Sequence, residues 1–214
     1  LHVVPGRDRE SVDGAVLRMQ EIWTSTSRAA TEEDYENIAK ATPGRRVAVA
    51  RAIPLYNPQS NLAERTPAML TLVVLPYSGR PFPMPDERFL GCVRQQVEKY
   101  RPICTEVRVI PPVYVGVSVR VDVIAREREE LVKEEVRRAL DKFFAVARGE
   151  QVGRPVQESA VIGAVGGAGS VLGVAGCTLG STVAGCRVNK HGDVVIPRHA
   201  IAYLSALEVH IFRQ

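Results

Sequence analysis

The stretch from Val113 to Arg148 constrains the fold most, because its hydrophobic period changes once along its length. Valine occupies every second position from Val113 to Val123, which is the pattern of a half-buried strand. From Glu127 the apolar residues recur at the spacing of one helix face, and Gly149 stands where a helix stop is expected. These apolar residues are Leu131, Val132, Val136, Ala139, Leu140, Phe143, Phe144 and Ala147. We therefore predict a strand over 113–125 and a long amphipathic helix over 127–148, which must both pack onto other elements or subunits.

Composition narrows the class of protein. A chain of 214 residues suits one large or two small domains, and a hydrophobic fraction of 45% is enough for a core. The net charge of +4 is small, and on the predicted long helix the basic residues alternate with acidic ones. Acidic residues at that spacing repel phosphate. We therefore predict that this helix exposes a charged face to solvent and does not bind nucleic acid.

The four cysteines are Cys92, Cys104, Cys177 and Cys186. They form no CxxC motif and have no histidines at ligand spacing, so we expect no zinc site. We see no secretory leader and no long apolar run, so we expect free thiols in a reducing cytoplasm and no membrane contact. The sequence begins at Leu1 without a methionine, and we expect a fragment of a longer protein with a further N-terminal region.

Residues 1–28 are predicted to form a helical lead-in. Ser11 is its expected N-cap, and the apolar face is formed by Val12, Val16, Met19 and Ile22. A second helix begins at Thr31, where Asp34 takes the place of the acid in a capping box. It carries Tyr35, Ile38 and Ala39 inward and stops at Thr42-Pro43-Gly44.

Residues 29–111 are predicted to form a first α/β module. Val47–Ile53 reads as a strand with Val47, Val49 and Ala52 on its apolar side, and Met69–Leu75 reads as a strand buried on both faces. Pro76–Pro85 is expected to be extended. The remaining elements are a helix marked by Phe89, Val93, Val97 and Tyr100, a short strand at Glu106–Ile110, and a boundary at Pro111-Pro112.

Residues 112–214 are predicted to form a C-terminal α/β module. After the central strand and helix we expect a short helix from Gln157, a glycine-rich stretch over 166–180, a polar loop or hairpin over 187–198, and a terminal strand at 207–212. The predicted fold class is therefore α+β, with two small modules that each pack a mixed or antiparallel sheet against helices.

The glycine run Gly163–Gly173 is the strongest candidate for a binding motif. A dinucleotide loop needs G-x-G-x-x-G after a strand and at the start of a helix. Here the third glycine is one residue late and the preceding segment reads as helix. We favour a helix end and loop in which glycine supplies positive φ, and we keep a small-ligand or nucleotide-binding module as the alternative function.

The remaining candidate residues have structural explanations. His191 and Asp193 lie in an H-G-D turn, and His2, His199 and His210 lack a nucleophile motif. Cys104 is expected to be a buried thiol that behaves as a small hydrophobe. Glu32, Glu33 and Asp34 suit the first turn of a helix. We therefore assign no catalytic, cofactor-binding or metal-binding residue and predict that the protein is not an enzyme.

Several segments, taken in order, resemble the baseplate J-like proteins of contractile phage tails and contractile injection systems. The first are Gly6–Ser11 and the run Arg28–Glu36, which resembles the family's T-x-E-D-Y-E helix start. The others are Thr42-Pro43-Gly44 with Val47, Ala50 and Arg51, then Val73–Pro76, Pro112-x-Tyr114-Val115, Leu140–Phe144, and Gly153-Arg154 with Ser159. The chain departs from the family pattern at Trp23-Thr24-Ser25, at Asn57–Ala68, and in the glycine content of Gly163–Gly173.

The resemblance implies a structural subunit of the baseplate wedge, from a phage, a prophage or an injection device. It implies contacts with other copies of the chain and with neighbouring wedge or sheath-linking proteins, between the hub and the sheath. It implies no catalysis, cofactor, small-molecule substrate or nucleic acid. The location it implies is the bacterial host cytoplasm during assembly and then the baseplate of the tail or injection particle.

Overall fold

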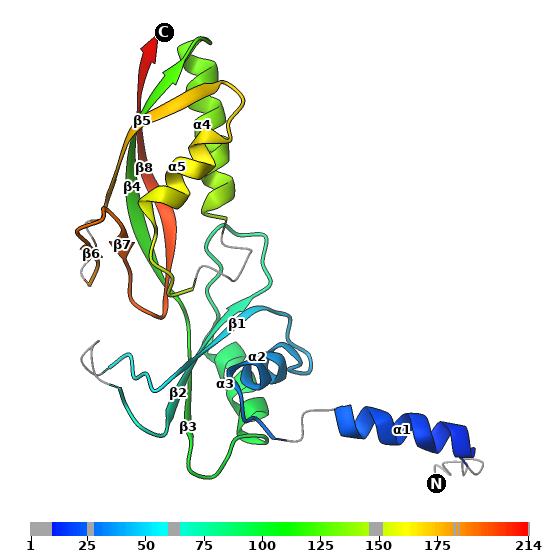
Figure 1. The fold of residues 1–214 in the computed structure, drawn as a ribbon. Coiled ribbons are helices and arrows are strands. Elements are labelled where there is room, and N and C mark those ends of the chain that lie inside the picture. The colour runs from blue at the N-terminus through cyan, green and yellow to red at the C-terminus, as the bar shows by residue number, and fades with distance from the viewer. Residues whose placement is uncertain are drawn as a thin grey trace.

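A computed structural model describes residues 10–24, 28–59, 65–145, 152–181, 183 and 185–213. The helices are α1 (Val12–Thr24), α2 (Glu32–Lys40), α3 (Glu87–Glu98), α4 (Glu129–Phe143) and α5 (Glu158–Gly166). The strands are β1 (Val47–Pro54), β2 (Met69–Pro76), β3 (Glu106–Ile110), β4 (Val113–Ala125), β5 (Val171–Gly180), β6 (Arg187–Val188), β7 (Val194–Val195) and β8 (Ala200–Arg213). The fold is α+β, as predicted, with small mixed sheets packed against helices (Figure 1).

The first sheet has the strand order β1-β2-β3, with β1 antiparallel and β3 parallel to β2. Helices α2 and α3 cover one face, and their buried residues Tyr35, Ile38, Phe89, Val93 and Val97 form one core with β1 and β2 (Figure 1). Strand β2 is buried on both faces, which confirms the prediction for 69–75.

Helix α2 begins with the predicted capping box. The Thr31 side chain accepts a hydrogen bond from the Asp34 amide, and the Asp34 carboxylate accepts one from the Thr31 amide at 2.8 Å. These bonds satisfy two backbone donors that a helix start leaves unpaired. At the other end Gly44 adopts a φ of 71°, which glycine tolerates best.

The predicted apolar side of β1 is wrong in part. Ala50 and Ala52 lie in the core under the helices, whereas Val49 and Ile53 lie on the opposite face of the sheet. The pairing with β2 shifts register between Val47 and Val49, so alternation counted from Val47 fails after that point. Strand β1 is therefore apolar on both faces.

The second sheet has the strand order β5-β4-β8 and forms the other half of the molecule (Figure 1). Strand β5 is antiparallel and β8 parallel to β4. Helices α4 and α5 lie on one face, and the valine row of β4 is fully buried beneath them from Val115 to Val123. The bounds of β4 match the prediction, although Val113 itself is 44% exposed.

The long helix is shorter than the predicted 127–148. It starts at Glu129 and ends at Phe143, and residues 146–150, including the expected stop Gly149, lie outside the described part. Val132, Val136 and Leu140 are buried as predicted, but Leu131 is 47% exposed. The buried stripe therefore follows a four-residue spacing, and Leu131 lies at its edge.

Two strands of the second sheet were not predicted in full. The glycine-rich stretch after Gly166 contains β5, and β8 begins at Ala200, seven positions before the predicted 207. Glycine is rare in strands, but at Gly180 it allows close approach, because a Cβ atom there would lie 2.8 Å from Ser118 Oγ. The predicted hairpin over 187–198 is present as β6 and β7.

A third apolar cluster joins the two halves. Val49, Ile53, Tyr56, Val73 and Leu75 from the first sheet pack with Ile201 of β8 and with Val152. A second contact is aromatic, since Phe82 meets Tyr114 and Tyr203 edge to face at centroid distances of 5.2 and 4.8 Å. Pro111-Pro112 lies between β3 and β4, where the chain passes from one sheet to the other.

Helix α1 lies apart from both sheets (Figure 1). The Ser11 hydroxyl accepts a hydrogen bond from the Gly14 amide at 3.1 Å, which agrees with the predicted N-cap. The predicted apolar face of α1 is not buried, because Val12 is 80% exposed and Val16 and Met19 are about half exposed. The Ile22 side chain lies outside the described part.

Candidate functional site

The glycine run Gly163–Gly173 does not have the geometry of a phosphate loop. It occupies the end of α5 and the turn into β5, whereas a phosphate loop leads into the positive end of a helix dipole. Gly167 has a φ of −79°, and no glycine of this run has positive φ, so that part of the prediction is wrong.

The carboxylate of Glu135 lies at the turn between α5 and β5 in this run. The Ser170 amide donates to Glu135 Oε2 at 3.0 Å, and hydrogen bonding from Ser170 holds the pKa of Glu135 below its ordinary value. A negative charge at this position disfavours a bound phosphate.

The H-G-D turn is a structural device. Asp193 Oδ1 accepts a hydrogen bond from the Glu158 amide at 3.0 Å at the start of α5, and Oδ2 accepts one from Asn189 Nδ2 at 2.9 Å. The bond from Asn189 and then the one from Glu158 lower the pKa of Asp193. Glycine suits position 192, because its φ is 82°, a backbone conformation that residues with a Cβ atom rarely adopt. His191 is exposed on the same turn, and its interaction with Asp193 is the last and smallest of the causes that lower the pKa of Asp193.

All four cysteines are free thiols. Cys104 is exposed, not buried as predicted, because it lies in the turn between α3 and β3 next to the fully exposed Ile103. Burial raises the pKa of Cys177 to about 11, which is the opposite of what a nucleophilic thiol needs. Within the described ranges, no group of three or more His, Cys, Asp or Glu side chains could hold a metal ion.

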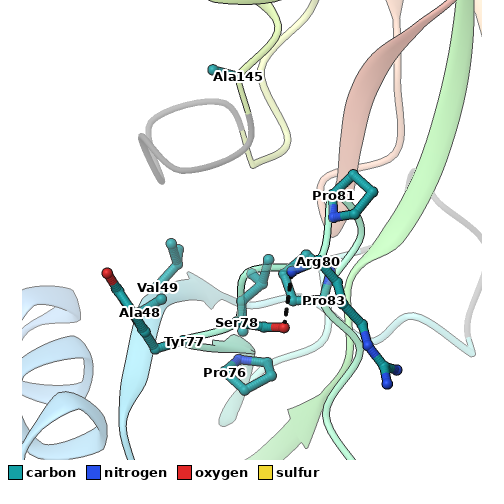
Figure 2. A pocket seen from close by; sticks show the side chains of 10 residues that line it. Ala48, Val49, Pro76, Tyr77, Ser78, Arg80, Pro81, Pro83 and Ala145 are labelled. Atoms are coloured by element: carbon teal, nitrogen blue, oxygen red, sulfur yellow. Dashed lines mark hydrogen bonds between the residues drawn. The ribbon is translucent and has the colours of Figure 1, made fainter.

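A cavity of about 360 Å³ lies beside the first sheet, opposite its helices (Figure 2). Val49 and Leu75 belong to its lining, the segment after β2 supplies Tyr77 and Arg80, and Ala145 lies across from Val49 and Tyr77. Among the described residues its lining contains no carboxylate, histidine or thiol, and its polar side chains are those of Tyr77, Ser78 and Arg80. It is an apolar hollow near the junction of the two halves.

The surfaces are more distinctive than the cavities. Besides α1, the face of the second sheet opposite α4 and α5 is uncovered around Arg120 among the described residues. There it carries the exposed ion pair of Arg120 with Glu208 at 2.6 Å and the exposed ring of Phe212. A groove of about 590 Å³ runs between α4 and β8. It is lined by Lys133, Glu134, Arg137, Leu207, Glu208, Val209 and His210.

Among the described helices, none is both long and apolar enough to cross a bilayer.

The fold is α+β, with two three-stranded sheets that are each packed against helices. The exposed surfaces described above are helix α1, one face of the second sheet and the groove along β8. The chain is similar, with a TM-score of 0.61 and 15% identity, to a chain in the six-fold-symmetrised cryo-electron microscopy structure of the anti-feeding prophage baseplate. The similarity covers 96% of this chain and 43% of that one, so this chain spans less than half the length of its neighbour. No protein-family model matches the chain, and no curated protein matches it. At this identity the likeness establishes the fold.

The sequence reasoning missed the residues that join the two halves. Tyr56 and His199 form a hydrogen bond of 2.6 Å, and the Arg198 guanidinium lies 5.6 Å from the centre of the Tyr56 ring. No local motif marks these residues. The one available signal was the row of apolar residues from Ala200 to Leu204, which indicates that β8 begins earlier than its alternating part.

Proposed function

We propose that the chain is a structural subunit of a contractile-tail or injection-system baseplate, related to the baseplate J-like proteins and active through assembly contacts without catalysis. The supporting observation is the similarity in fold to the anti-feeding prophage baseplate chain over 96% of this chain. The order of the sequence motifs resembling the J-like family supports the same class. Its partners would be other copies and neighbouring wedge or sheath-linking proteins, in the host cytoplasm during assembly and then in the particle.

Helix α1 is the first surface we assign to assembly. Isolated helices of fewer than about 12–15 residues are marginal in water, so a helix with exposed Val12, Val16 and Met19 needs a partner for its apolar side. An apolar helix face set apart from the body suits a contact with another baseplate polypeptide.

We also propose that residues 29–111 and 112–214 are two domains that move as one body. Each has its own core, and the cluster around Tyr56 and Ile201 joins them. A subunit that holds a fixed angle between two modules can transmit a change in its contacts to its neighbours as a rigid-body movement.

Genetic complementation tests the proposed function. Deleting the gene from its host should abolish sheathed particles in negative-stain micrographs, and the unaltered gene should restore them. The double substitution Val16→Asp and Met19→Asp should fail to restore them, because it places charge on the apolar side of α1. Asp13→Ser on another side of the same helix is the matched control and should restore them. Normal particle numbers in the deletion strain would contradict the proposal.

A further inference from the structure

We infer that the exposed edge of β8 is a self-complementary dimer interface, at which β8 of a second copy pairs antiparallel about Val209 and joins two three-stranded sheets into one of six strands. This rests on the proposed function, which names other copies of the chain as partners, and deepens it by assigning the contact between two copies to one strand edge.

The edge of β8 is built for pairing. β8 is the outer strand in the order β5-β4-β8, so one side of its backbone is unpaired within the described chain. From Ala206 to Arg213 its register with β4 is continuous, with no bulge. This stretch contains no proline and no lysine, the residues that commonly block exposed edges. By contrast, the pairing of β5 with β4 shifts register twice.

The two faces of this stretch differ in chemistry. Leu207, Val209 and Ile211 pack against the core under α4 and α5. Glu208, His210 and Phe212 point to the uncovered face and are exposed. Since directly opposite residues of an antiparallel pair point to the same face, a symmetric pairing must be centred on a residue.

Centring the pair on Val209 makes every facing pair favourable. On the core side Val209 meets its own copy, and Leu207 faces Ile211 of the second copy. On the uncovered side Glu208 faces His210, and Ala206 faces the exposed ring of Phe212. Cross-strand apolar pairs stabilise a sheet, the Glu208 carboxylate can accept a hydrogen bond from the facing His210 imidazole, and the two-fold axis doubles each off-centre pair. Centring on Glu208 would instead place two carboxylates opposite each other.

Helix α4 fits the same axis. A two-fold axis through Val209, perpendicular to the sheet, runs the two α4 helices antiparallel. Residues 129–135 of α4 carry four glutamates and Lys133, whereas residues 136–143 carry Arg137, Arg138, Lys142 and Asp141, so the first half is net negative and the second half net positive. The groove against Val209 is lined on the α4 side by Lys133, Glu134 and Arg137, and the axis brings the net negative half of one helix toward the net positive half of the other.

Sedimentation of the 214-residue chain tests the interface. We expect a species of twice the 23.4 kDa chain mass. The double substitution E208K and H210K places lysine opposite lysine and should give monomers, and H210E alone places glutamate opposite glutamate and should do the same. An equimolar mixture of the two variants should recover the dimer, because each lysine then faces a glutamate. All altered side chains are exposed, and circular dichroism checks that both variants fold.

Disulfide trapping tests the register, in a C104S background that removes the exposed native thiol. V209C should form a disulfide-linked dimer, since a facing pair lies within disulfide reach. I211C is the matched control and should stay monomeric, because two copies of residue 211 are four residues apart along the pair, about 13 Å. A monomeric unaltered chain, charge variants that still dimerise, or trapping at 211 in place of 209 would overturn the inference. Sedimentation and disulfide trapping use the isolated chain and test only the interface, whereas complementation tests the proposed function. Either claim can therefore fail while the other holds.

Discussion

The Tyr56 hydroxyl lies 2.6 Å from Nδ1 of His199, a hydrogen bond between residues 143 positions apart that joins the two halves of the molecule. Tyr56 is 2% exposed and belongs to the cluster between the sheets. Replacing Tyr56 with Phe keeps the ring and leaves His199 without its partner, so we expect a loss of roughly 1–2 kcal/mol in the free energy of unfolding. Urea unfolding measures it. Tyr77→Phe, at a side chain that is 75% exposed, is the control and should change little; equal losses would contradict the assignment.

His199 should make the stability depend on pH. Burial lowers the pKa of His199 below the 6.5 of a free histidine, so below that pH the unfolded chain takes up the proton before the folded chain does. The stability associated with neutral His199 is therefore present above about pH 6.5 and is lost as the pH falls through the folded pKa. Urea unfolding at a series of pH values should show this loss in the unaltered chain and a smaller one in His199→Gln. An unchanged pH dependence in the variant would show that another group is responsible.

Asp193 should be needed for the stability of the C-terminal half and not for chemistry. Asp193→Ala removes the hydrogen bond to the first turn of α5, and we expect the melting temperature to fall on the order of a few degrees. His191→Ala at the exposed tip of the same turn should leave the melting temperature nearly unchanged. Differential scanning calorimetry compares the two, and a larger effect at His191 would reverse the assignment.

Two leucines of α4 test which side of that helix is packed. Leu140 is fully buried, so Leu140→Ala should cost about 2–5 kcal/mol of stability. Leu131 is 47% exposed, and Leu131→Ala should change stability by no more than ~0.5 kcal/mol. Chemical denaturation measures both. Similar costs at the two positions would mean that Leu131 packs as the sequence pattern predicted.

Elements with a strong local pattern could be predicted from the sequence. The valine alternation of β4, the continuous apolar run of β2 and the capping box at Thr31 each specify their element through neighbouring residues, and the structure confirms all three. Where the outcome depends on residues far apart in the chain, local patterns were insufficient. β5 is a strand because β4 pairs with it despite its glycines, and Val47 and Val49 lie on different faces of β1 because its register shifts between them.

For the candidate functional residues, too, local sequence patterns predicted some features, whereas contacts between distant residues determined the others. That Asp193 lies in a turn followed from its neighbours, but that it holds the start of α5 depends on a residue 35 positions away. The exposure of Cys104 depends on how the turn after α3 lies against the sheet, which no local pattern specifies. The edge of β8 could be found only once the strand order was known.

Cryo-electron microscopy of particles purified from the host tests the central claim most directly. We expect the baseplate map to contain density for both three-stranded sheets of this chain, with α2 and α3 on one and α4 and α5 on the other, in contact with neighbouring subunits. A complete baseplate map in which all density is assigned to other polypeptides, with this chain absent from the particle by mass spectrometry, would contradict the account.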